Sequence, residues 1–176
     1  EIIREKGTNR SAFFRGQVDK YTWVDVGSSY LPGELIAAFL WAQLQQGDDI
    51  TRRRLGIWRH YHEKLAGLEE RGWIRRPIVP EGCVHNAHMY YVLLPSLAQR
   101  QEVIRRMRER GVSPVFHYVP LHSAPAGRRF ARAHGELRNT DELSERLLRL
   151  PLWIGVDREL VIDTFSAVCA EVCGTA

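Results

Sequence analysis

The chain is poor in lysine, in cysteine and in long apolar runs, and each shortage excludes a class of protein. Only three of its 25 basic side chains are lysines, Lys6, Lys20 and Lys64, so the net charge of +4 rests on arginine. Its three cysteines lack the paired spacing of a disulfide framework, which favours a reducing, cytoplasmic compartment. The longest apolar run, residues 35–41, is too short to span a bilayer, and residues 1–10 lack the apolar core of a signal peptide.

The remaining composition is typical of a globular protein. Hydrophobic residues make up 44% and charged residues 26% of the 176 positions, enough for one domain with a core or a small domain plus a piece of another. The chain starts without methionine and in the middle of a pattern, so we expect a piece of a longer protein. The arginine excess fits a chain that meets anionic small molecules, and it also fits weak nucleic-acid contact.

The first 72 residues predict loops followed by two long helices. Residues 1–31 lack a helical period, and we expect loops and a short strand there. Residues 32–72 carry two helical patterns separated by Gly47, which is expected to end the first. That first pattern starts at Pro32 and is apolar nearly all round, which indicates burial between domains or subunits. The second can be capped by the two aspartates that follow Gly47.

Residues 73–176 predict a small α+β layer. Aromatic and β-branched runs indicate three short strands, and Pro114 favours an edge position for the middle one. Apolar periodicity indicates helices between and after these strands, the last running from Asp157. The strands are expected at 86–95, 112–120 and 148–153, and the first helix at 97–110, ended by Gly111. This order predicts a mostly antiparallel sheet with helices on one face.

The seven histidines and three cysteines form no evident metal site. In an extended chain, spacings of three or five residues place two side chains on opposite faces, and on a helix a spacing of two separates them by about 200°. Such spacings separate the close histidines His60 and His62, His85 and His88, and His117 and His122. Cys169 and Cys173 share a helix face but have no third ligand. We therefore expect no metal, and cysteines that serve as small core residues.

Other catalytic and binding motifs are also absent. Arginines alternate with glutamates, as in EVIRRMRER, which indicates a solvated face rather than a nucleic-acid surface. Ser123 follows His122, but no GxSxG motif is present, and sequence neighbours are not a catalytic triad. No glycine-rich loop of the P-loop or dinucleotide-binding type occurs.

Two stretches place polar and aromatic side chains where apolar packing is expected. His117 and Tyr118 stand at the end of a predicted strand, within SPVFHYVPLHSAP. Ser28, Ser29 and Tyr30 stand just before a predicted helix N-terminus, where free N–H groups and the helix dipole favour phosphate. Capping of that helix by a serine is the alternative interpretation.

Four segments together resemble one known family. Residues 1–44, NAHMYYV, FHYVPLHSAPAG and SERLLRLPLW are similar to the DegT/DnrJ/EryC1/StrS family of pyridoxal-phosphate (PLP) nucleotide-sugar aminotransferases. The resemblance implies the type I, aspartate aminotransferase-like fold, with this chain as its C-terminal part. Residues 1–31 would be the tail of the large PLP domain, 32–72 bridging helices, and 73–176 the small α+β domain. The Schiff-base lysine is expected upstream, so we expect no catalytic residue here and an inactive chain on its own.

The resemblance also implies roles for individual residues. In the family a Gly-Tyr-Asn-Tyr-Arg segment reaches across a homodimer, and Gly27 begins its counterpart here. Ser29 stands at the Asn position and is expected to contact the PLP phosphate. The family's Arg contacts the nucleotide-sugar, and Leu31, which stands at that position here, cannot make this contact. Tyr30 is expected to contact the sugar nucleotide, as are His117 and Tyr118. His122 is expected to be structural, with a backbone carbonyl as its partner.

The implied reaction moves an amino group from L-glutamate to the 4-keto carbon of a dTDP-4-keto-6-deoxyhexose, for bacterial surface glycans. The expected partners are these two substrates and a second copy of the chain, with no nucleic acid and no membrane. A non-catalytic sugar-nucleotide-binding or interaction module remains an alternative. A basic nucleic-acid module is a third, and it would show salt-sensitive binding to duplex DNA.

Overall fold

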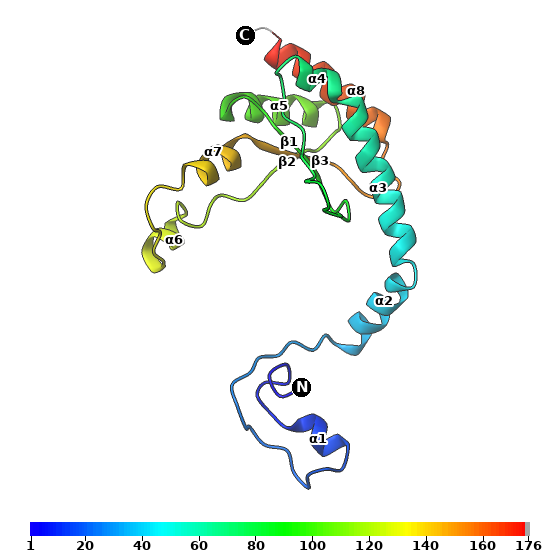
Figure 1. Ribbon diagram of the computed structural model, residues 1–176, viewed down its shortest axis with the longest axis vertical. Helices are drawn as coiled ribbons and strands as arrows, with labels where there is room; N and C mark the ends of the chain where they lie inside the picture. Colours follow the sequence, from blue (N-terminus) through cyan, green and yellow to red (C-terminus); the bar gives the residue numbers. More distant parts are fainter. Residues whose placement is uncertain (175–176) are drawn as a thin grey trace. The chain divides into compact units, whose positions relative to one another are not determined.

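The structure is a computed structural model that describes residues 1–174 and divides into two compact units. The first unit comprises Glu1–Gly47 and the second begins at Asp48. The first contains α1 (Arg10–Phe14) and α2 (Glu34–Leu44) (Figure 1). The other elements are, in chain order, α3 (Gly47–Lys64), α4 (Ala66–Glu70), β1 (Tyr90–Leu93), α5 (Leu97–Glu109), β2 (Val115–Phe116), α6 (Pro125–Phe130), α7 (Arg138–Arg146), β3 (Leu147–Leu150) and α8 (Arg158–Cys173).

The sheet of the second unit has three antiparallel strands in the order β1-β3-β2. Tyr90 lies opposite Leu150, and Val92 lies opposite Leu148. Because side chains alternate along a strand, these four buried residues share one face of the sheet. The small antiparallel sheet and the edge position of β2 are confirmed, although each strand is shorter than the sequence pattern indicated.

Helices pack on the buried face of this sheet and complete the core. Figure 1 shows α5 and α8 side by side over the strands, with α3 running past them. The helices contribute apolar side chains at a spacing of three to four residues, which places each set on one helix face. These core residues are Trp58, Tyr61 and Leu65 of α3, Val103, Ile104 and Met107 of α5, and Val161, Phe165 and Val168 of α8. The prediction of helices on one face is confirmed.

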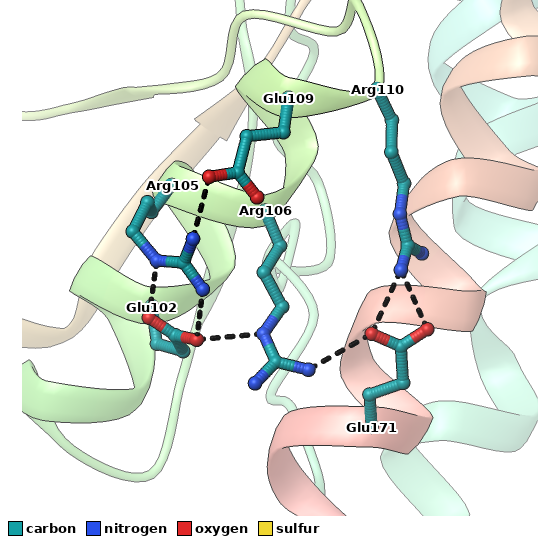
Figure 2. Close-up of polar contacts among 6 residues, drawn as sticks. All are labelled: Glu102, Arg105, Arg106, Glu109, Arg110 and Glu171. Atoms are coloured by element: carbon teal, nitrogen blue, oxygen red, sulfur yellow. Dashed lines mark hydrogen bonds and ion pairs between the residues drawn. The ribbon is translucent and has the colours of Figure 1, made fainter.

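Charged side chains connect α5 to α8 at the surface (Figure 2). Glu102 accepts hydrogen bonds from Arg105 and Arg106, which lower the pKa of its carboxyl to about 2. Arg106 and Arg110 then reach Glu171 on α8, with N–O distances of 3.0 and 2.7 Å. Arg105, Arg106 and Arg110 of EVIRRMRER are thus paired on a solvated face, where each such pair contributes little free energy.

The hydroxyl of Tyr61 allows one test of the core. It donates a 2.8 Å hydrogen bond to the backbone oxygen of Pro151, and the side chain is fully buried. We expect Tyr61→Phe to lower the free energy of unfolding by about 1 kcal/mol, because the Pro151 oxygen loses its donor. Urea titration followed by circular dichroism measures this.

Tyr90 supplies the matched control for that variant. Its ring contacts the Tyr61 ring at 5.4 Å and is equally buried, but its hydroxyl has no hydrogen-bond partner. Tyr90→Phe should therefore leave stability unchanged or raise it, since a buried unsatisfied group is removed. Equal losses in both variants would show that the hydroxyl of Tyr61 has no special role.

Several sequence expectations for the first helices are wrong in detail. Residues 1–31 contain a helix, α1, in which Arg10 lies over the ring of Phe14 at 5.2 Å. The first long helix begins at Glu34, not Pro32, and ends before Gly47, which is the first residue of α3. The aspartates after Gly47 therefore lie in the first turn of α3. There their negative charges interact favourably with the helix dipole, but neither residue is the N-cap of the helix.

The sequence predicts that the apolar helix α2 is buried, but residues 1–174 do not cover it. None of its residues is buried, and Leu35 is 88% exposed. An apolar helix becomes buried only where another surface faces it, so its composition alone does not ensure burial. The described residues also contain no helix long and apolar enough to cross a membrane.

Candidate functional site

A hollow of about 550 Å³ lies in the second unit between α5, α7 and the segment that follows β2. Strand β2 ends at its second residue, Phe116, and the chain then passes through His117 and Tyr118 toward Pro120. Its aromatic side chains form one wall, α5 forms another and α7 forms the third. The hollow has the size of a small-molecule site.

His117 and Tyr118, both predicted site residues, line this hollow together. Their rings pack edge to face with centroids 5.3 Å apart, and Tyr118 is 77% exposed. The Nδ1 atom of His117 is buried and has no hydrogen-bond partner. The site thus offers one open aromatic face beside a buried imidazole nitrogen that has no hydrogen-bond partner.

Carboxylates line the α7 side of the hollow, and a histidine lies next to one of them. Asp141 and Glu145 line it, and the Nε2 of His122 lies 2.9 Å from an oxygen of Asp141. The same nitrogen makes no well-oriented hydrogen bond, so the two groups interact by charge when His122 is protonated. His122 is therefore next to a carboxylate, not the backbone carbonyl that the sequence suggested. Ser123 lines the same hollow and donates to the backbone oxygen of Pro120.

Arginines occupy the α5 side of the hollow. Arg100 and Arg108 are eight residues apart, so they lie on the same face of α5 with Ile104 between them. Arg100 is buried, and its guanidinium lies over the Phe116 ring at 5.5 Å. Burial lowers the pKa of Arg100, and only the charge of Glu145 opposes this.

The first unit contains a separate hollow of about 510 Å³ that includes Ser29. Three cations line it, Arg4, Lys6 and Arg10. Glu5 and Glu34 also line it, and the carboxylate of Glu5 accepts the amide and hydroxyl of Ser11 in bonds that lower its pKa. A serine hydroxyl among three cations is chemically suited to a phosphate group.

Backbone contacts position Ser29 in that hollow. The segment runs antiparallel to residues 3–7, with Ser28 donating its N–H to Ile3 and Lys6 donating to the backbone oxygen of Ser28. Gly27 starts the segment so close to this neighbour that a Cβ would lie 2.2 Å from the nitrogen of Gly7. A glycine is therefore required at the position where the sequence resemblance also places one.

The serines before α2 do not cap it. The N-cap position is Gly33, and no side chain accepts a hydrogen bond there. Capping, the alternative interpretation of Ser28 and Ser29, is thus wrong. Tyr30 is 69% exposed and does not line the hollow that contains Ser29.

Sequence reasoning missed the charged side chains that surround both sites. The sequence pattern gave Arg100 no role, although this arginine is buried on the same helix as apolar Val103 and Ile104. Its position four residues before Ile104 was the available signal, because residues at that spacing share a helix face. Arg4 and Arg10 gave no signal, since they come together only through the loop that carries Ser29.

Comparison with known proteins identifies the family of the chain. The profile of the DegT/DnrJ/EryC1/StrS aminotransferase family matches residues 1–169. The chain belongs to this family. A curated relative, dTDP-4-dehydro-2,3,6-trideoxy-D-glucose 4-aminotransferase of Saccharopolyspora spinosa, is 30% identical over 134 residues, which are 76% of this chain and 33% of the relative.

Solved structures show the same fold. The aminotransferase TlmJ from Streptoalloteichus hindustanus superposes with a TM-score of 0.79 at 25% identity, covering 99% of this chain and 44% of TlmJ. Streptococcus pneumoniae Spr1654, described as a sugar aminotransferase in its PMP form, superposes with a TM-score of 0.79 at 22% identity, covering 97% and 44%. The chain thus spans less than half the length of each of these three proteins.

The comparisons confirm the family and the fold inferred from the sequence. The second unit is a small antiparallel sheet with helices of a PLP-type aminotransferase. Within the described residues, no group of three or more histidine, cysteine, aspartate or glutamate side chains is arranged to hold a metal ion.

Proposed function

We propose that this chain forms part of a sugar aminotransferase and contributes its dTDP-sugar contacts through the hollow beside α5. The observation that carries the proposal is the joint position of His117 and Tyr118 in one open hollow of a family member. The curated relative from S. spinosa acts on a dTDP-sugar, as its name states. An exposed aromatic ring can stack on a nucleobase, and an imidazole nitrogen without a partner can hydrogen-bond a sugar hydroxyl once the ring moves enough to expose it.

The specific substrate that we propose is a dTDP-4-keto-6-deoxyhexose aminated at C4 by L-glutamate, as in dTDP-4-amino-4,6-dideoxygalactose synthesis for surface glycans. Its support is the KYTW and GSSYLP segments, whose Leu31 stands where an arginine contacts the substrate in other branches. The proposed setting is the cytoplasm, which the three free cysteines support. A homodimer is supported by the exposed apolar side chains of α2. Residues 1–31, 32–72 and 73–176 would be the large-domain tail, bridging helices and small domain.

The cationic hollow of the first unit fits the phosphate of PLP. Ser29 would donate its hydroxyl, and Arg4, Lys6 and Arg10 would balance the phosphate charge. When bound, PLP supplies the carbonyl carbon that accepts and releases the amino group. The residues of this chain then position the substrates, because none of its three lysines lies in the motif that carries the family's Schiff-base lysine.

A binding measurement on Tyr118→Ala tests the proposal. We expect the chain to bind dTDP, and the variant to bind it about tenfold more weakly, since loss of base–aromatic stacking costs about 1–3 kcal/mol. Isothermal titration calorimetry gives the two dissociation constants. Phe130→Ala is the control, because its ring is equally exposed at 77% but lies outside the hollow. Equal affinities for all three proteins would contradict the proposed function.

A further inference from the structure

Arg100 is buried without a carboxylate at ion-pair distance among residues 1–174, and the charge of Glu145 acts on it only from further away. Only 8% of its surface is exposed, and its Nε atom has no hydrogen-bond partner. Among residues 1–174, no carboxylate lies within ion-pair distance of it, although nearby Arg105 and Arg106 on the same helix are each paired. A buried charge without a partner destabilises the folded state, so this position needs an explanation beyond packing.

The surroundings of Arg100 show where a partner would come from. Its side chain lines the 550 Å³ hollow, and its guanidinium lies over the ring of Phe116, which lines the same hollow. Water competes weakly for a donor in such a place, which strengthens a bond to an arriving anion. Arg108 lies two turns further along the same face, so both cations belong to one wall.

Positive and negative side chains line opposite walls of the hollow. Arg100 and Arg108 lie on α5, whereas Asp141 and Glu145 lie on α7. The net charge of these four groups is zero, so the hollow does not attract every anion. A ligand with an oxyanion at one end and hydroxyl or ammonium donors at the other would satisfy both walls.

We infer that Arg100 is a substrate-binding residue whose guanidinium receives an oxyanion of the ligand in this hollow. The inference rests on the proposed function, and it names the group that the substrate must present. The diphosphate of a dTDP-sugar is one source of that oxyanion, and a carboxylate of the amino donor is the other. A planar guanidinium bonds both groups through two parallel N–H donors.

The Nε–H resonance of Arg100 reports the contact directly. In ¹⁵N-resolved NMR of the 176-residue chain, its signal is assigned by its loss in Arg100→Lys. We expect dTDP to shift this signal while thymidine, which lacks the diphosphate, does not. A shift with L-glutamate instead would support the carboxylate source. No shift with dTDP, pyrophosphate or L-glutamate would overturn the inference.

Affinity and stability should move in opposite directions in Arg100→Met. The variant keeps the apolar stem of the side chain, and we expect dTDP to bind it about tenfold to a hundredfold more weakly. Without ligand, its melting temperature should rise by about 2–4 °C, because an unpaired buried charge is gone. Arg105→Met is the matched control, since Arg105 lies on the same helix but pairs with Glu102 and Glu109 outside the hollow. It should change neither quantity in this way.

The outcomes separate this inference from the proposed function. If dTDP binds and Tyr118→Ala weakens it while Arg100→Met does not, the function stands and the role of Arg100 is wrong. Pyrophosphate or L-glutamate could shift the Arg100 signal while Tyr118→Ala leaves the affinity for dTDP unchanged. In that case Arg100 binds anions and the dTDP-sugar assignment is wrong. Lower stability together with unchanged affinity in Arg100→Met would make Arg100 a structural residue.

Discussion

Replacing Phe165 with alanine is expected to remove a large part of the stability of the second unit. The side chain lies in the centre of α8, is fully buried, and belongs to the cluster that joins the helices to the sheet. Truncation of a buried phenylalanine costs about 3–5 kcal/mol, through lost apolar contact and the cavity that remains. Since domains of this size are stable by about 5–15 kcal/mol, a large part of the variant should be unfolded in mild urea. Equilibrium denaturation followed by circular dichroism measures the loss.

Leu160→Ala is the matched control for this experiment. Leu160 is on the same helix and loses a similar apolar side chain, but it is 49% exposed. Its change should therefore stay below about 1 kcal/mol, since surface substitutions leave no cavity. A similar loss in both variants would mean that burial of Phe165 makes no special contribution, and that the cluster around it is not the core.

A second large effect concerns PLP chemistry. We expect the 176-residue chain to form no defined borohydride-reducible adduct with PLP and to convert no PLP to its amine form with L-glutamate. The reason is the position of its lysines. Lys20 and Lys64 are exposed, and Lys6 lies in the hollow that is suited to the phosphate group of PLP, away from its carbonyl carbon. Mass spectrometry of peptides after reduction locates any adduct, and absorbance follows the cofactor.

Lys6→Arg gives this prediction a sharp control. The variant keeps the positive charge beside Ser29 but cannot form an imine. Scattered, substoichiometric labelling that is equal in the two proteins fits our expectation. Stoichiometric labelling at Lys6, accompanied by formation of the amine form with L-glutamate, would show instead that the chain carries its own Schiff-base lysine, and the assignment of its catalytic group to another segment would be wrong.

The sequence predicted the elements whose limits depend on local chemistry. Gly111, with a φ of 79°, follows the end of α5, and Asp157 caps α8 by accepting the N–H of Leu160 at 3.0 Å. Both signals act within one helical turn, so they can be recognised without knowing the rest of the fold. The edge position of β2 followed from Pro114, which lacks an N–H for a second neighbour.

The two hollows and the exposed helix could not be predicted in the same way. Whether Arg100 is buried depends on Phe116 and on α7, which are distant in sequence and come together only in the folded unit. The burial of α2 depends on a facing surface, which its own apolar pattern does not specify. Family resemblance pointed to Ser29, His117 and Tyr118, but it gave no information on the cations and carboxylates around them.

The order of strands in the sheet has a consequence for how the second unit folds. The central strand, β3, is the last of the three in the chain, and β1 and β2 each pair with it rather than with each other. Tyr90 meets its partner Leu150 across a loop of about sixty residues, and closure of such a loop costs entropy before any pairing compensates for it. During synthesis, β1, α5 and β2 must therefore leave the ribosome with exposed edges and wait for β3. Such a topology favours slow, late and cooperative folding.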